Sequence, residues 1–177
     1  DEERRVKEEL EKLLEDLRRT IKKVEEDSDR INKDLERVIR RSEREADKIL
    51  EDLERAGVSE ELLKRLEDLV KRIKETHEEL LRRLKKSSDE LREELERLLR
   101  EIEKMVRDAE DVLRRNVSEE KLRELLERAK KLVEDIKRRL KELLDRHRDL
   151  VRRIKERSKE LNKRLKDLID EIKERAR

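Results

Sequence analysis

Apolar residues recur every three or four positions along almost the whole chain, and most residues between them are charged. This spacing is typical of amphipathic helices that each bury one face. The mean step is about 3.57 residues, between the period of a left-handed coiled coil and that of a straight helix. The pattern therefore predicts long, nearly straight, coiled-coil-like helices.

The apolar pattern is interrupted at only two places, and both carry the signals of a helix end followed by a helix start. Gly57 and Asn116 are the residue types that most often end a helix in the left-handed conformation. Ser59 and Ser118 follow two positions later and can cap the next helix, and each is followed by two glutamates. One unbroken helix with a tolerated glycine is the alternative, but it leaves the caps unexplained. We therefore expect three helices, over about residues 2–55, 60–114 and 119–176.

Short turns between long helices predict the fold. Helices joined by a few residues become antiparallel neighbours. Each helix has one apolar stripe and a charged remainder, which fits three helices that pack only on one another. We therefore expect an all-α fold, an up-down-up three-helix bundle that forms a single domain over residues 1–177.

A few uncharged polar residues occupy or flank stripe positions, and folding the chain at its turns brings them to two levels. The first turn places residue i near residue 115 minus i, and the second places residue j near 234 minus j, with an offset of roughly 119 between the parallel first and third helices. The first predicted buried polar network then comprises Ser28, Asn32, Ser87, Ser88 and His147. The second comprises Ser42, Thr76, His77, Ser158 and Asn162.

Buried networks of this kind are tolerable only if their members bond one another. An unpaired buried hydroxyl or imidazole costs about 1–3 kcal/mol. A satisfied network adds little net stability, but it disfavours other registers in which polar groups would face leucine. The alternative is that these serines and threonines bond only their own helix, and we assign Thr20 to that group because nothing lies level with it.

Composition removes several classes of function. The chain has 177 residues, of which 60% are charged, yet its net charge is only +2. The charges alternate in sign, so no basic tract could bind phosphate, and without aromatic residues no surface could stack bases. There is no cysteine, no apolar run that could span a membrane and no targeting signal. We expect a soluble protein that requires no partner, nucleic acid or membrane, and its localisation is unknown.

No catalytic or metal site emerges from the sequence. The two histidines fall in different predicted networks, and neither network offers a cysteine or a carboxylate on the stripe, so a metal site is not expected. Each network pairs a serine with a histidine, but an acidic third member and an oxyanion hole are missing. No glycine-rich phosphate loop is present. We therefore expect no enzyme activity and no cofactor.

The chain resembles de novo designed helical bundles with modular buried hydrogen-bond networks. The resemblance is carried by the two Val-Ser-Glu-Glu helix starts, the matched helix lengths, the uncharged polar layers between apolar layers, and the absence of Pro, Cys and aromatic residues. Proteins of that class are scaffolds, orthogonal oligomers or two-state switches. Spectrin-like three-helix repeats are a weaker match, because the core tryptophan typical of those repeats is missing.

Three functional hypotheses follow. The first is a structural scaffold, a monomer whose buried polar networks fix the helix register. The second is an interaction module, in which the stripes close between copies of the chain or against a designed helical partner. The third is a pH-sensitive bundle, because burial of neutral His77 and His147 is expected to lower their pKa values.

Overall fold

The computed structural model describes residues 2–175, which form three α-helices: α1 (Glu2–Arg55), α2 (Glu60–Arg114) and α3 (Glu119–Arg175). These bounds lie within one residue of the ranges expected from the apolar pattern, and Ala176, the last residue expected in the third helix, lies outside the described residues. Acidic residues occupy the first turn of each helix and basic residues the last, which complements the helix dipole.

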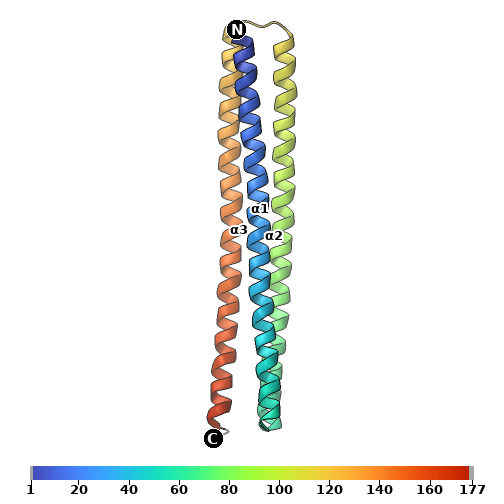
Figure 1. Ribbon diagram of the computed structural model, residues 1–177, viewed down its shortest axis with the longest axis vertical. Helices are drawn as coiled ribbons and strands as arrows, with labels where there is room; N and C mark the ends of the chain where they lie inside the picture. The colour runs from blue at the N-terminus through green and yellow to red at the C-terminus, as the bar shows by residue number, and fades with distance from the viewer. Residues whose placement is uncertain (1, 176–177) are drawn as a thin grey trace. The chain divides into compact units, whose positions relative to one another are not determined.

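The chain divides into two compact units, and each helix contributes one segment to each unit. Unit 1 comprises the chain up to Asp29 together with Ser88–His147, and unit 2 comprises Arg30–Ser87 together with the chain from Arg148 onward. Within each unit, α2 runs antiparallel to α1 and α3 (Figure 1). All three helices pack against one another, so the predicted all-α three-helix bundle is confirmed. That residues 1–177 form a single domain stays a prediction.

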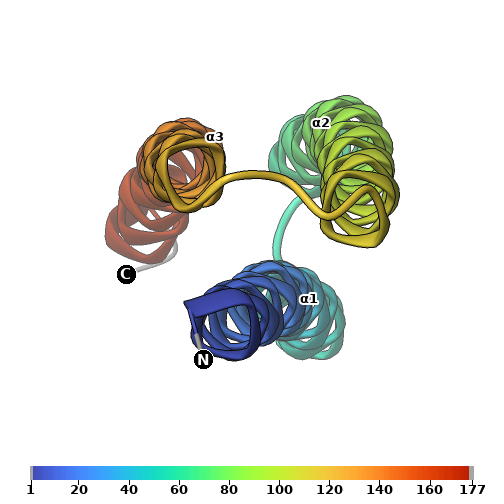
Figure 2. The same ribbon diagram turned by 90° about the horizontal axis from the view of Figure 1, so that it is seen from above.

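Unit 1 encloses its core between all three helix segments. The ends of the helices nearest the viewer in Figure 2 belong to this unit, and they lie at the three corners of a triangle. Side chains from each segment meet in this core, and many are completely buried. Representative core residues of unit 1 are Leu17, Ile21, Leu98, Ile102, Ile136 and Leu140.

Unit 2 has a core of the same kind, again with contributions from all three helices. Burying a side chain of this size contributes roughly 1.5–3 kcal/mol, so packing dominates the stability of both units. Representative core residues of unit 2 are Leu35, Ile39, Leu66, Ile73, Ile154 and Ile172.

The first turn ends α1 with a complete Schellman motif. Gly57 has a φ of 74°, a left-handed conformation that is unfavourable for any L-residue with a Cβ atom. Its N–H donates to the carbonyl of Glu54 at 3.2 Å, and the N–H of Val58 donates to the carbonyl of Leu53 at 3.4 Å. Val58 and Leu53 also belong to one apolar cluster, so the turn is joined to the core of unit 2.

The second turn has a left-handed residue at the equivalent place, Asn116, with a φ of 56°. The serines that follow the two turns cap α2 and α3. The Ser59 hydroxyl accepts from the N–H of Leu62, and the Ser118 hydroxyl accepts from that of Lys121, each at 3.4 Å. The sequence signals therefore correspond to two left-handed turns and two capped helix starts.

The observed register differs from the expected one between α1 and α2. Glu43 on α1 contacts His77 on α2, so their residue numbers add up to 120 where about 115 was expected. Between α2 and α3, His77 contacts Ser158 as expected, and these numbers add up to 235 where about 234 was expected. Contacts between the parallel helices α1 and α3 are separated by 120 and 121 residues, close to the expected 119.

Candidate functional site

The most distinctive polar feature of unit 2 is a histidine that connects all three helices. His77 on α2 is completely buried. Its Nδ1 lies 3.1 Å from a carboxylate oxygen of Glu43 on α1, and its Nε2 lies 3.0 Å from the hydroxyl of Ser158 on α3. Ser158 is also buried, at 3% exposure, and the Glu43 side chain is only 12% exposed. We call these three residues the Glu43–His77–Ser158 relay.

The chemistry of Glu43 fixes which ring nitrogen of neutral His77 carries the proton. An ionised carboxylate can only accept hydrogen bonds, so Nδ1 must donate to it. Nε2 of neutral His77 is then unprotonated and accepts from the Ser158 hydroxyl. The relay therefore has one direction, with the serine donating to the imidazole and the imidazole donating to the carboxylate.

An arginine at the edge of unit 2 extends the relay toward the surface. Arg40 lies 3.3 Å from the second carboxylate oxygen of Glu43 and 2.9 Å from the carboxylate of Glu78 on α2. The hydrogen bond with Glu78 and the charges of both carboxylates raise the pKa of Arg40, which outweighs its partial burial. Arg40 therefore occupies the carboxylate oxygen of Glu43 that His77 does not contact.

A second polar contact lies between α1 and α3 in the same unit. The Ser42 hydroxyl donates to Oδ1 of Asn162 at 2.6 Å, and both residues are half-buried. Ser42 precedes Glu43 in the chain, and Asn162 lies one helical turn after Ser158. Four members of the second predicted polar network, Ser42, His77, Ser158 and Asn162, therefore take part in these two inter-helical contacts.

The fifth member, Thr76, has a different partner from the one expected. Its hydroxyl donates to the backbone carbonyl of Arg72 on its own helix at 2.9 Å. Thr20, which was assigned a local role, donates to the carbonyl of Asp16 in the same way. The bond shown for Thr76 is therefore of the helix-solvating kind.

Glu43 corrects the sequence analysis, which found no carboxylate on either stripe and no acidic third member beside a serine–histidine pair. Glu43 follows Ile39 by four positions and precedes Ala46 by three, and both of those residues are buried. These are core spacings, so a signal was present. It was missed because the sequence alone does not distinguish a glutamate at this spacing from the exposed glutamates of α1.

The residues of the first predicted polar network are distributed over both units. Ser28, Ser88 and His147 belong to unit 1, whereas Asn32 and Ser87 belong to unit 2. Ser28 and His147 are buried, and the other three are half-buried. None of Asn32, Ser87, Ser88 and His147 is without an interaction partner. Burial lowers the pKa of His147, because a buried imidazolium loses hydration.

The buried polar side chains of the described residues have hydrogen-bond partners. Within residues 2–175, no fully buried side-chain nitrogen or oxygen lacks a hydrogen-bond partner. A buried polar group without a partner costs more than a typical hydrogen bond contributes. The buried serines and histidines therefore carry no such penalty.

Ion pairs between helices line the surface of both units. Lys137 on α3 lies 2.7 Å from the carboxylate of Asp16 on α1 in unit 1, and its hydrogen bond and charge lower the pKa of Asp16. Lys74 on α2 lies 2.8 Å from Asp47 on α1 in unit 2. These side chains are largely exposed, and exposed pairs contribute at most about 1 kcal/mol.

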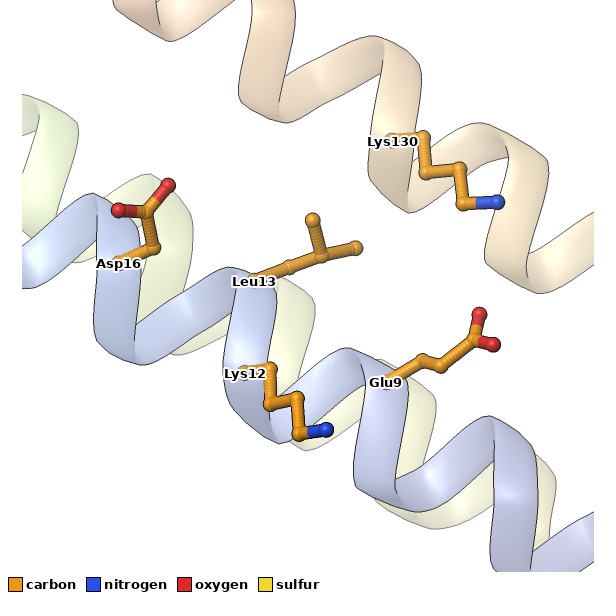
Figure 3. Close-up of a pocket in the computed structure, with 5 residues that line it drawn as sticks. All are labelled: Glu9, Lys12, Leu13, Asp16 and Lys130. Carbon is orange, nitrogen blue, oxygen red and sulfur yellow. The ribbon is translucent and has the colours of Figure 1, made fainter.

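Two shallow grooves run between α1 and α3, one in each unit. In unit 1 the groove has a volume of about 350 Å³. Leu13 projects from α1 toward α3 there, with charged side chains around it (Figure 3). Apart from Leu13 its lining is charged, namely Glu9, Lys12, Asp16 and Lys130.

The groove in unit 2 has a volume of about 380 Å³ and is lined by more apolar residues than the groove in unit 1. The Ser42–Asn162 pair forms part of its wall, so it begins one helical turn from Ser158. Its apolar lining residues are Ala46, Ile49, Leu165 and Ile169, and its charged ones are Glu45, Lys166, Asp170 and Lys173.

The part of the chain that the structure describes has neither a metal-binding cluster nor a helix that could span a membrane. No group of three or more His, Asp or Glu side chains from residues 2–175 is placed to hold a metal ion. In the same range, no helix carries an apolar stretch long enough to cross a lipid bilayer. Comparison with known proteins gave no match to any family model, curated protein or solved structure.

Proposed function

We propose that the chain is a designed structural scaffold, a single-chain helical bundle whose buried polar contacts specify the helix register. The observation that carries this proposal is the position of His77, which contacts partners on both other helices from a completely buried site. On this proposal the protein has no natural substrate and needs no cofactor or partner. The designed origin rests on the resemblance of its sequence pattern to designed bundles.

The surroundings of His77 explain how the relay selects one register. If α3 slipped by one heptad, His77 would face Val151 or Leu165 in place of Ser158, and both of these residues are buried and apolar. The same slip would move Asn162 away from Ser42. Each buried polar group left unpaired costs about 1–3 kcal/mol, so a slipped register is disfavoured even though its apolar stripes still match.

Distances between spin labels test this proposal. Arg44 on α1 and Arg164 on α3 are exposed, belong to unit 2 and are separated by the 120 residues of the observed register. Labels at these positions should give one narrow distance distribution in the unaltered sequence. A variant with Ser42→Ala, Glu43→Ala, His77→Leu, Ser158→Ala and Asn162→Leu removes the polar contacts while keeping the core apolar.

The proposal expects the apolar variant to gain additional distances, since a slip of one heptad moves a label by about 10 Å along the helix axis. Circular dichroism confirms that the variant remains helical. A folded variant that keeps the single narrow distribution would show that the turns and the apolar pattern set the register without the polar contacts. The structural role proposed for the relay would then be wrong.

A further inference from the structure

The Glu43–His77–Ser158 relay joins its three groups in the order used by activated serine nucleophiles. A serine hydroxyl at 3.0 Å from an imidazole nitrogen is within reach for proton transfer, and the opposite ring nitrogen is held by a carboxylate at 3.1 Å. We propose that Ser158 is an acylation site for small, uncharged, activated esters, with His77 as general base and Glu43 as the residue that positions His77. This reactivity goes beyond a scaffold function.

The groups around the relay orient the imidazole of His77. From α1, Glu43 faces Nδ1, and Arg40 pairs with Glu43 behind it. From α3, the uncharged hydroxyl of Ser158 is the hydrogen-bond partner of the imidazole. On α2 itself, Lys74 and Glu78, three residues before and one residue after His77, are engaged with Asp47 and Arg40. The imidazole is therefore held with Nε2 directed at the serine.

The groove of unit 2 provides the approach for a reagent and determines its class. Asn162 is a wall residue of this groove and lies one turn from Ser158 on the same helix. Its apolar lining favours an uncharged acyl group, whereas the lysines and acids at its rim remain hydrated. Ser158 is 3% exposed and does not itself line the groove, so the proposal requires a small ester to pass between the helices beside Asn162.

The reaction is an acyl transfer with a balanced proton path. The Ser158 oxygen attacks the carbonyl carbon of the ester while its proton moves to Nε2 of His77. The tetrahedral intermediate then collapses, the carbon–oxygen bond to the leaving group breaks, and p-nitrophenolate departs when the reagent is p-nitrophenyl acetate. The acyl group remains on Ser158, and His77 passes its proton to the departing p-nitrophenolate, which carries it out of the site and leaves the imidazole neutral.

The position of Ser158 within a long helix limits the reaction to one acylation per chain. Backbone N–H groups in the interior of α3 are committed to helical hydrogen bonds, so they cannot form an oxyanion hole. The acyl-serine is an alkyl ester with a far poorer leaving group than p-nitrophenolate, so without an oxyanion hole its hydrolysis is slow. The expected outcome is a stable acyl-serine without turnover.

Acetylation of the full chain by p-nitrophenyl acetate tests the proposal. At about pH 8, peptide mapping by mass spectrometry should find acetyl-Ser158 forming about a hundredfold faster than acetylation of Ser42, because Ser42 has no general base. His77→Asn and Glu43→Gln should each slow labelling of Ser158, by about a hundredfold for His77→Asn. Thr76→Ala is the matched control, because Thr76 adjoins His77 but bonds its own helix, and it should leave the rate unchanged.

Two further readouts separate activation from mere structural support. The pH profile of Ser158 labelling in the unaltered chain should differ from that of Ser42, because only Ser158 has an imidazole nitrogen beside its hydroxyl. Nitrogen NMR of His77 should show the neutral ring protonated at Nδ1, and Glu43→Gln should change that signature while circular dichroism stays the same. Both readouts use the folded chain and need no variant that abolishes Ser158.

Several outcomes would overturn the proposal. One is acetylation confined to lysines and the N-terminus. Another is labelling of Ser158 at an unchanged rate in folded His77→Asn or Glu43→Gln. A pH profile of Ser158 labelling that matches that of Ser42 in the unaltered chain would also contradict a general-base role, and this test holds even if a variant fails to fold.

Discussion

The hydroxyl of Ser42 lies 2.6 Å from Oδ1 of Asn162, although 120 residues separate them in the chain. This contact joins α1 to α3 directly, without passing through α2. It has a matched comparison in Thr20, whose hydroxyl bonds a carbonyl oxygen of its own helix. The two hydroxyls allow an inter-helical bond to be compared with a local one in the same protein.

Ser42→Ala should lower the free energy of unfolding by about 1 kcal/mol, because the Asn162 carbonyl loses its donor in a half-buried place. Thr20→Ala should change it by less than about 0.5 kcal/mol, since the helix keeps its own backbone hydrogen bonds. Guanidinium unfolding of both variants measures the difference. Equal losses in the two variants would show that the Ser42–Asn162 contact has no special contribution.

Acid should weaken the protein through His147. Burial lowers the pKa of this imidazole below its ordinary value, so the unfolded chain takes up a proton at a higher pH than the folded one does. The stability contributed by His147 is therefore fully present above about pH 6.5 and is lost progressively as the pH falls through the folded pKa.

His147→Asn isolates this contribution. Unfolding free energies of the unaltered chain and of His147→Asn should be measured at several pH values, with His77 present in both. The difference between them should move in favour of the variant as the pH falls below about 6.5. A difference that stays constant with pH would contradict the assignment. Whether acid opens the bundle, as the pH-sensitive hypothesis requires, is read from the helical content of the same samples.

The left-handed residue of the first turn should resist substitution. Gly57→Ala should cost about 1 kcal/mol, because a φ of 74° is unfavourable for a residue with a Cβ. Nothing lies within 4 Å of the place that the Cβ would take, so the cost is conformational and not steric. Asn116→Gly is the control at the second turn, where glycine also suits the conformation and the change should be within about 0.5 kcal/mol. Thermal unfolding measures the stability of both variants. A Gly57→Ala variant as stable as the unaltered chain would contradict this expectation.

The helix ends were predictable because their signals are local. A left-handed residue, a capping serine and a pair of acids lie within five positions at each turn, so no long-range information was needed. The bounds of α1 and α2 follow from these signals and from the apolar period. The bundle itself follows from short turns and single stripes.

The polar site was less predictable because it depends on the lateral position of each side chain. A glutamate beside a buried stripe can turn toward solvent or toward a buried partner. The location of His77 makes the inward position favourable for Glu43. Thr76 shows the opposite case, because its own helix offers a nearer acceptor than the neighbouring helices do. Pairing by residue number also placed residue 38 of α1 opposite His77, where the structure places Glu43.

The scaffold proposal requires the three apolar stripes to pack on one another within a single chain. Size-exclusion chromatography with light scattering tests it most directly, over a hundredfold range of concentration. The account predicts a constant mass near 21.8 kDa, the mass of one chain. A multiple of that mass, or a mass that rises with concentration, would contradict it and would favour the interaction module, in which the stripes close between chains.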